Sequence, residues 1–265
     1  MANNHIWDFG ENGFKRTVDE LKGCVLIGAG KNIEDSYKEV IFSKNMTKIG
    51  FLAAAEWGFG ASENSGGFAW LNHDQFEVKI KNIRKMVDIL IVQLHAGLEL
   101  VDIPLPEWRQ KYKHFIDLGV DLIIGHHPHI VQPWEKYRGK YIFYSLGNFY
   151  FGKNDKSIAV SVSIKNRSIV LNKIISIEAE KNSIIISKNK VVNNNKLTEP
   201  KYIKSVTKEI NKVWKERYQK YYEGMVTQSI FRNKKINENM LRHNLRIETH
   251  LFSTFRYLAQ KTNEK

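Results

Sequence analysis

Histidine and asparagine side chains gather at three places in this sequence. They open the chain or follow directly on an apolar run: Asn4, His5, His95, His126, His127 and His129. In an α/β fold, the loops that follow neighbouring strands meet in one crevice, so these imidazoles and an amide oxygen can converge on one divalent metal ion. The sequence therefore favours a metal-dependent, hydrolase-like site.

The strongest of these signals is the run Gly125-His126-His127-Pro128-His129. The fixed backbone dihedral of proline stiffens the loop, so His127 and His129 on either side of it can turn into one pocket while His126 points elsewhere. Three histidines in four residues after a buried strand are hard to explain by packing. For His126 alone, a structural role explains the sequence as well as a ligand role does.

The other polar positions carry less weight by themselves. A lone histidine at the end of a strand, such as His95, is often simply hydrogen-bonded, and the same alternative stands for Asn4 and His5. The position of His95 at the end of a parallel-type strand strengthens the case for His95 as a metal ligand. His73 and His114 are expected at the surface.

The elements that position these residues alternate between helix and strand as far as residue 130. Helical patterns cover 11–21, 75–86 and 106–118, and strand patterns cover 24–27, 38–42, 48–54, 87–94 and 120–124. This order predicts an α/β core whose strands deliver His95 and the histidine run. Cys24 is the single cysteine, which excludes an internal disulfide, and its apolar neighbours predict a small core residue in a buried strand.

After residue 130 the pattern changes to β-branched strands and then to helices. A hairpin is predicted over 130–145, further antiparallel strands over 158–164, 168–178 and 183–187, and two long helices over 202–222 and 237–260. The asparagine run 193–195 reads as a polar linker. We therefore expect an α/β (α+β) domain over 1–192 and a basic helical extension over 193–265.

Charge is spread unevenly along the chain. The formal net charge is +13, and residues 201–265 hold 15 Lys and Arg against 6 Asp and Glu. Such a field attracts nucleic acid, an anionic membrane surface or a polyanionic polymer. The alternative is a solvated helical face. Because the tail shows neither zinc-finger spacing nor a glycine-rich single-strand motif, and its aromatics follow helical packing positions, nucleic acid ranks last.

Targeting signals are absent from the sequence as written. No stretch approaches the roughly 20 apolar residues that span a bilayer, and the first residues lack the basic and apolar regions of a secretory signal. These features predict a cytoplasmic protein, or one of the cell envelope if a preceding segment carries an anchor.

Five short segments between residues 2 and 151 carry a more specific pattern. They read Ala2-Asn3-Asn4-His5-x-x-Asp8-x-Gly10, Gly28-Ala29-Gly30-x-Asn32, Leu94-His95-x-Gly97-x-Glu99, Gly119-x-Asp121-x-Ile123-Ile124-Gly125-x-His127-Pro128-His129-x-x-Gln132-Pro133 and Tyr144-Ser145-Leu146-Gly147-Asn148-Phe149. In this order they resemble the capsule synthesis protein CapA family, the polyglutamate-capsule proteins that share the calcineurin-like metallophosphatase fold. The resemblance implies a metallophosphatase-like β-sandwich flanked by helices.

The resemblance also implies ligands for metal ions. Asn4, His95 and His127 would hold one ion, and His129 would belong to a neighbouring one. A carboxylate such as Glu99 would hold a ligand imidazole in the correct tautomer. Asparagine and histidine ligands suit zinc, manganese or iron about equally well.

A catalytic pair is implied beside these ligands. His5 would face the leaving group as an electrophile or general acid, and Asp8 would orient His5. Two adjacent ions would activate a bridging water and neutralise phosphoryl oxygens.

The sequence departs from the family pattern at its start. Neither the Asp-x-His block nor the Gly-Asp-x-x-Asp block of metallophosphatase-like chains occurs, and Met1 stands three residues before Asn4. We therefore expect an N-terminally shortened member that binds at most one divalent ion. The first strands of the sandwich would also be missing, so an unpaired sheet edge is expected.

Two function hypotheses follow. The first is a metal-dependent hydrolase or transferase of capsule or exopolymer biosynthesis, acting on a phosphate ester or on an amide bond of the polymer, with its chemistry impaired by the missing blocks. The second is a non-catalytic accessory protein that positions an anionic capsule polymer. Expected partners are that polymer or a phosphorylated substrate, together with other capsule-synthesis proteins.

Overall fold

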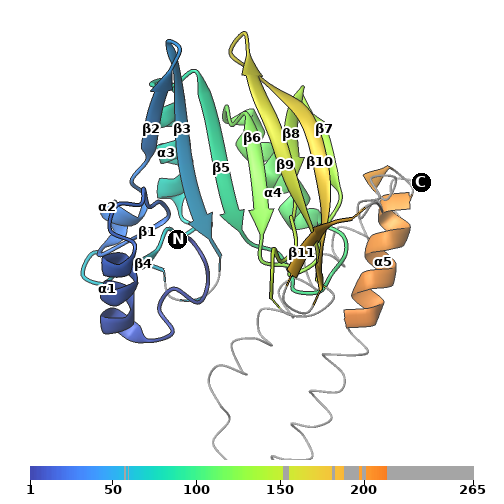
Figure 1. The fold of residues 1–265 in the computed structure, drawn as a ribbon, viewed down its shortest axis with the longest axis horizontal. Helices are drawn as coiled ribbons and strands as arrows, with labels where there is room; N and C mark the ends of the chain where they lie inside the picture. The colour runs from blue at the N-terminus through green and yellow to red at the C-terminus, as the bar shows by residue number, and fades with distance from the viewer. Residues whose placement is uncertain are drawn as a thin grey trace, which may run out of the picture.

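The computed structural model describes residues 1–56, 58, 60–151, 155–180, 183–187, 197–198 and 201–213. Its centre is a six-stranded sheet. Helices α3 (Asp74–Arg84) and α4 (Pro106–Asp117) cover one face of this sheet, and a three-stranded sheet covers part of the other face (Figure 1). The predicted α/β class, with a sheet sandwich flanked by helices, is confirmed.

The six-stranded sheet has the order β2-β3-β5-β6-β8-β7. Its strands are β2 (Val40–Lys44), β3 (Thr47–Ala55), β5 (Ile89–His95), β6 (Leu122–His126), β7 (Trp134–Tyr137) and β8 (Lys140–Phe143). The four inner strands run parallel, and β2 and β7 pair antiparallel at the edges. In the register of β5 and β6, His95 lies opposite His126, so the polar residues that follow both strands meet at one edge.

Burial on both faces explains why the inner strands are almost continuously apolar. β5 reads Ile-Leu-Ile-Val-Gln-Leu-His, and every residue except Gln93 and His95 is buried. On the helical face, α3 and α4 meet through an edge-on contact of Phe76 with Phe115 at 5.4 Å between ring centroids. Pro106 begins α4, and Gly119, with φ of +108°, follows its end, as the sequence predicts.

The smaller sheet consists of β9 (Lys156–Lys165), β10 (Ser168–Glu180) and β11 (Ser183–Ile186), all antiparallel. Ile158 of β9 and Ile169 of β10 share one apolar cluster with Leu122 and Phe143 of the larger sheet. Among the described residues, β9 has no second partner strand apart from an isolated bridge between Gly147 and Ser157. Within the part of the chain that the structure describes, β9 is therefore an edge strand of the smaller sheet.

The segment before β2 forms a small lobe that contains α1 (Gly10–Glu20), β1 (Ala29–Gly30) and α2 (Ile33–Ser36). The strand β4 (Gly67–Phe68), which follows β3 in the chain, joins this lobe by pairing with β1. The prediction of a buried strand over 24–27 is wrong, because this segment is a loop with Val25 61% exposed. Cys24 is exposed rather than in the core. A four-residue apolar run is too short to have a period, so it does not distinguish a strand from a loop.

Helix α5 (Lys201–Val213) packs on the helical side of the sheet. Its buried side chains Tyr202, Val206, Ile210 and Val213 belong to the same core cluster as α3 and α4. The start of the predicted helix 202–222 is thus confirmed, while its remainder and the predicted helix 237–260 lie outside the described residues. The division into domains at residue 193 stays a prediction.

Candidate metal centre

Three ligand-type atoms from distant parts of the chain converge beyond the ends of β5 and β6. Asn4 Oδ1 lies 2.8 Å from His95 Nε2, and His127 Nδ1 lies 3.1 Å from the same nitrogen. The rings of His95 and His127 are 4.8 Å apart between centroids. The structure thus brings together the three side chains that the resemblance names as ligands of one ion.

These distances fit a divalent ion. Ligand atoms about 2.1 Å from one ion, at right angles to each other, lie about 3 Å apart. One amide oxygen and two imidazole nitrogens also form a donor set suited to zinc, manganese or iron. The residues therefore fit a metal, and the assignment of Asn4, His95 and His127 as its ligands stays a prediction.

The backbone of the histidine loop is held in an unusual conformation. His127 has φ of +96° and His129 has φ of +61°, values that residues with a β-carbon rarely adopt. Backbone hydrogen bonds from Ala96 to His126 and from Leu100 to Pro128 tie this loop to the loop after β5. Such strain persists only where the surroundings enforce it, and it is common at functional sites.

The far side of His127 faces a carboxylate. Glu99 Oε1 lies 3.8 Å from His127 Nε2, and Glu99, His127 and His129 present potential ligand atoms within 4.8 Å of one another. A neutral imidazole has one lone pair for a metal, so His127 would serve one ion through Nδ1 and direct its Nε2–H toward Glu99. At 3.8 Å this contact is longer than a hydrogen bond, so the supporting role of Glu99 stays a prediction.

His129 is oriented by a residue to which the sequence gave no role. Its Nδ1 donates to Asn148 Oδ1 at 2.9 Å, which leaves Nε2 for a ligand. Asn148 lies in the segment 144–149, which is one of the five segments that carry the family resemblance. The sequence therefore marked Asn148 as part of the pattern but did not indicate that it bonds to His129. The structure places His129 beside His127, with 5.8 Å between ring centroids, and not among the three converging atoms.

His5 and Asp8 form a pair at the same site. His5 Nδ1 donates to Asp8 Oδ2 at 2.8 Å, and His5 Nε2 lies 3.4 Å from Asn4 Nδ2, which donates to it. One neutral tautomer satisfies both bonds. The His5 side chain is 66% exposed and Asp8 bonds to its ring, while the catalytic roles that the resemblance implies for His5 and Asp8 stay predictions.

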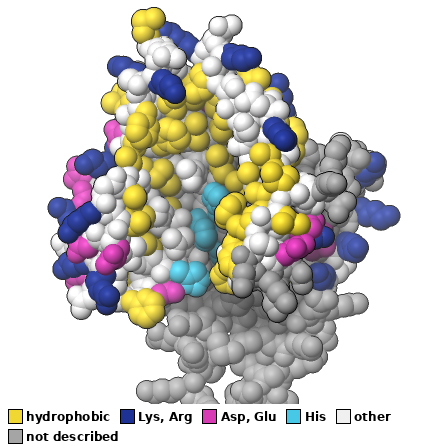
Figure 2. Space-filling model, in the orientation of Figure 1, with side chains coloured by type: hydrophobic (Ala, Val, Ile, Leu, Met, Phe, Trp, Pro, Cys, Tyr) yellow, Lys and Arg dark blue, Asp and Glu magenta, His cyan; other side chains and the backbone are white. Residues whose placement is uncertain are grey.

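The histidines line a cavity of about 350 Å³. Figure 2 shows histidine side chains along the hollow between the two sides of the molecule, below an apolar patch. The expectation that His126 points elsewhere is wrong, because it lines this cavity together with His95, His127 and His129. His126 lies opposite His95 in the register of β5 and β6, and the left-handed backbone at His127 lets His127 line the same cavity as its neighbour His126. Burial lowers the pKa of His126, as does the N-terminal ammonium.

A buried carboxylate supports the loop after β5 and was missed by the sequence reading. Glu56 is 5% exposed, follows β3 directly, and accepts a hydrogen bond from the Gly97 backbone N–H at 2.9 Å. Gly97 has φ of +112°. No spacing in the sequence marks Glu56, because its partner is a backbone group. His73 and His114 are exposed, as predicted.

The comparisons with known proteins bear on this site. The family model of the bacterial capsule synthesis protein PGA_cap matches residues 1–153. The chain belongs to this family. All six predicted site residues lie within the PGA_cap match.

Curated relatives share this part of the chain. The PGA biosynthesis protein CapA of Bacillus subtilis is 37% identical over 156 residues, covering 57% of this chain and 41% of the relative. The capsule biosynthesis protein CapA of Bacillus anthracis is 35% identical over 164 residues, covering 57% and 39%. A protein of Mycobacterium tuberculosis named probable polyglutamine synthesis accessory protein is 29% identical, covering 56% and 43%. The chain thus spans about two fifths of the length of these relatives.

Solved structures resemble the fold only loosely. A phosphatase from Mycoplasma pneumoniae aligns with a TM-score of 0.38 and 12% identity, over 54% of this chain and 58% of that one. A TM-score of this size leaves the chemistry to be inferred from the site itself. No helix within the described ranges is long and apolar enough to cross a membrane.

Proposed function

We propose that this chain acts in capsule polymer synthesis as a metal-dependent hydrolase or transferase, with one divalent ion held by Asn4, His95 and His127. The supporting observation is the convergence of these three neutral ligand atoms within hydrogen-bonding distance at the ends of β5 and β6. The bond acted on is an amide or phosphate ester of an anionic substrate.

The charge of the site supports an anionic substrate. Neutral ligands do not themselves compensate the charge of a divalent ion, and residues 1–200, which include the site, carry a net charge of +4. A bound ion would supply Lewis acidity, which polarises a carbonyl or phosphoryl oxygen. Carboxylates of a polyglutamate chain or phosphoryl oxygens are the groups that such a field attracts.

His5 is the residue placed to handle a proton. Because its Nδ1 is bonded to Asp8, the ring can exchange a proton with substrate only at Nε2, which faces Asn4. Asp8 stabilises the ring when it is protonated, so His5 fits a general acid for the leaving group. His5 therefore acts on the substrate, and Asp8 acts through His5.

The test measures chain length of poly-γ-glutamate, and release of phosphate from a phosphodiester, with and without added Mn²⁺ or Zn²⁺. We expect slow metal-dependent cleavage by the full chain. His127→Ala should lose both the metal and the activity, whereas His5→Ala should lose activity and keep the metal. His114→Ala, at an exposed histidine of α4, is the matched control. Metal-dependent cleavage that survives in His5→Ala would rule out the role of His5.

A second candidate is a non-catalytic accessory protein that holds the polymer. One relative carries an accessory role in its name, and the neutral ligand set favours holding carboxylates as much as reacting with them. Metal-dependent binding of poly-γ-glutamate without any shortening would favour this candidate. In that case other capsule-synthesis proteins would supply the chemistry.

A further inference from the structure

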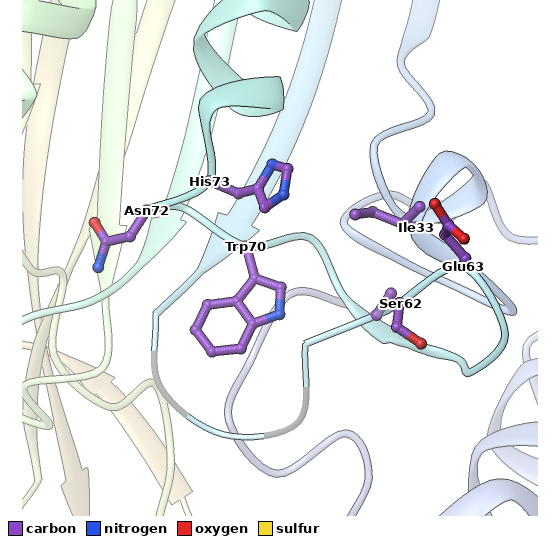
Figure 3. A pocket seen from close by; sticks show the side chains of 7 residues that line it. Ile33, Ser62, Glu63, Trp70, Asn72 and His73 are labelled. Atoms are coloured by element: carbon purple, nitrogen blue, oxygen red, sulfur yellow. The ribbon is translucent and has the colours of Figure 1, made fainter.

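A second hollow, of about 520 Å³, lies below α3 and shares no lining residue with the cavity of the metal centre. Its principal lining residues are Ile33, Ser62, Glu63, Trp70, Asn72 and His73 (Figure 3). Trp70 forms a bridge with Ala55 of β3, and Ala55 lies opposite His95 of β5. Two strand spacings put the Trp70 backbone roughly 10 Å from that of His95, at the same edge of the sheet.

The indole of Trp70 is held firmly on one side. Gly60 leaves no room there, because a β-carbon at this position would overlap Nε1 of the indole. The ring of Phe68 packs against it at 5.6 Å between centroids. Because Trp70 is only partly buried, the exposed part of its indole forms an apolar wall of the hollow, and the contacts on its other side fix the orientation of this wall.

Two polar side chains in the hollow have bonding capacity to spare. His73 Nδ1 accepts from the Gln75 backbone N–H at 3.2 Å, so the neutral ring carries its proton on Nε2 as a donor. Glu63 is exposed, makes no ion pair or side-chain hydrogen bond with any residue that the structure describes, and offers its carboxylate as an acceptor. Figure 3 shows the His73 ring turned toward Ile33 and Glu63, with the Trp70 indole below.

The charges around the hollow select the class of ligand. A cationic ligand would meet Lys111, whose ammonium donates to Asn72 at the wall, and an anionic ligand would meet Glu63. A neutral molecule that offers hydroxyl groups to Glu63 and His73 and an apolar face to Trp70 avoids both repulsions. Sugar rings combine these features.

We infer that this hollow binds a pyranose ring of a neutral glycan. Trp70 packs against the apolar face of the ring, Glu63 accepts hydrogen bonds from its hydroxyl groups, and His73 Nε2 donates to a ring or hydroxyl oxygen. Binding is independent of the metal centre, so it persists in protein treated with a chelator.

Saturation-transfer NMR of the full chain with maltose, cellobiose and N,N′-diacetylchitobiose tests this inference, with affinity taken from fluorescence titration. Glu63→Ala removes the acceptor at an exposed site, and His73→Asn keeps an N-cap acceptor for α3 while removing the Nε2 donor. Glu63→Ala should bind the preferred sugar about tenfold more weakly, because a hydrogen bond to a charged group is worth at least about that factor. His73→Asn should weaken binding less, by about fivefold, because its donor belongs to a neutral ring. Glu20→Ala and His114→Asn, at exposed positions of α1 and α4, are the matched controls.

Several outcomes would overturn the inference. No saturable sugar binding by the full chain would do so, as would equal affinity of Glu63→Ala, His73→Asn and the controls. Tighter binding of choline or lysine amide than of any sugar, lost in Glu63→Ala, would instead make the hollow a cation site. Loss of sugar binding on chelation would assign the sugar to the metal centre.

Discussion

Arg109 donates two hydrogen bonds of 2.9 Å to the two carboxylate oxygens of Glu135. The Tyr144 hydroxyl also donates to Glu135, at 2.5 Å, and the Arg109 guanidinium lies 4.3 Å above the ring of Tyr202. These contacts join α4, β7, the residue after β8, and α5. Both charged side chains are about 15% exposed, so the pair is largely shielded from water.

Replacing Glu135 should destabilise the protein. Glu135→Gln leaves the Arg109 charge buried without its partner, which costs about 3 kcal/mol of unfolding free energy. Urea denaturation followed by circular dichroism measures the change. Glu20→Gln, at an exposed position of α1, should have no measurable effect, and equal stability of the two variants would contradict the role assigned to the pair.

The same pair should make stability depend on acid pH. Burial raises the pKa of Glu135, but the hydrogen bonds from Arg109 and Tyr144 and the charges of Arg109 and Lys113 outweigh it and hold the pKa below its usual value. The carboxylate therefore stabilises the fold above the unfolded pKa of about 4.3, and this contribution is lost as pH falls through the folded pKa. The difference in urea midpoint between the protein and Glu135→Gln should shrink between pH 7 and pH 3. A constant difference would argue against ionisation as its source.

Metal stoichiometry should be low. The converging side chains of Asn4, His95 and His127 provide ligands for one ion, so we expect at most one weakly held divalent ion per chain. The double variant His95→Ala, His127→Ala should lose it, and His114→Ala should not. Elemental analysis after gel filtration gives the count, and two tightly bound ions would mean that other residues complete a second site.

Helix α5 should be required for folding of the core. Val206 is fully buried whereas the next residue, Thr207, is exposed. Val206→Asp buries an unpaired charge and should cost more than about 3 kcal/mol, while Thr207→Asp changes the charge equally at the surface. Melting temperatures separate the two variants. A chain ending at Lys196 should aggregate for the same reason, because the apolar surface under α5 is then exposed.

Binding of an anionic polymer should depend on salt. Residues 214–265 carry 11 Lys and Arg against 5 Asp and Glu. If they attract poly-γ-glutamate through their field, affinity should fall steeply from 0.1 M to 1 M salt, because the screening length shortens from about 10 Å to about 3 Å. A chain ending at Val213 keeps α5 and should bind more weakly. Unchanged affinity of that shorter chain would leave the metal centre as the polymer site.

The parts of the fold that the sequence predicted are those with a clear period or a clear stop. Strands β3, β5 and β6 are apolar because both their faces are covered, and α4 has a proline at its start and a glycine after its end. Loops gave no such signal. The run 24–27 is apolar without being buried, since nothing packs on it from both sides.

In the site, the ligand-type side chains were predictable and the groups that hold them were not. Histidines after strands are rare enough to notice, so Asn4, His95 and His127 could be grouped through the resemblance. Glu56 holds a backbone amide, and that role depends on how β3 and β5 lie side by side. The presence of both His126 and His127 at the cavity depends on the register of β5 with β6 and on the left-handed backbone at His127.

The contact between Asn4 and His95 joins residues 91 positions apart in the chain, and it links the opening segment to the central sheet. An ion held there would bind the folded chain and not the unfolded one, in which these residues are far apart. Free ligand at 100 times its dissociation constant then stabilises the fold by about 2.7 kcal/mol. Metal should therefore raise the melting temperature and slow amide exchange in the opening segment. Both effects are expected whether or not any substrate is turned over.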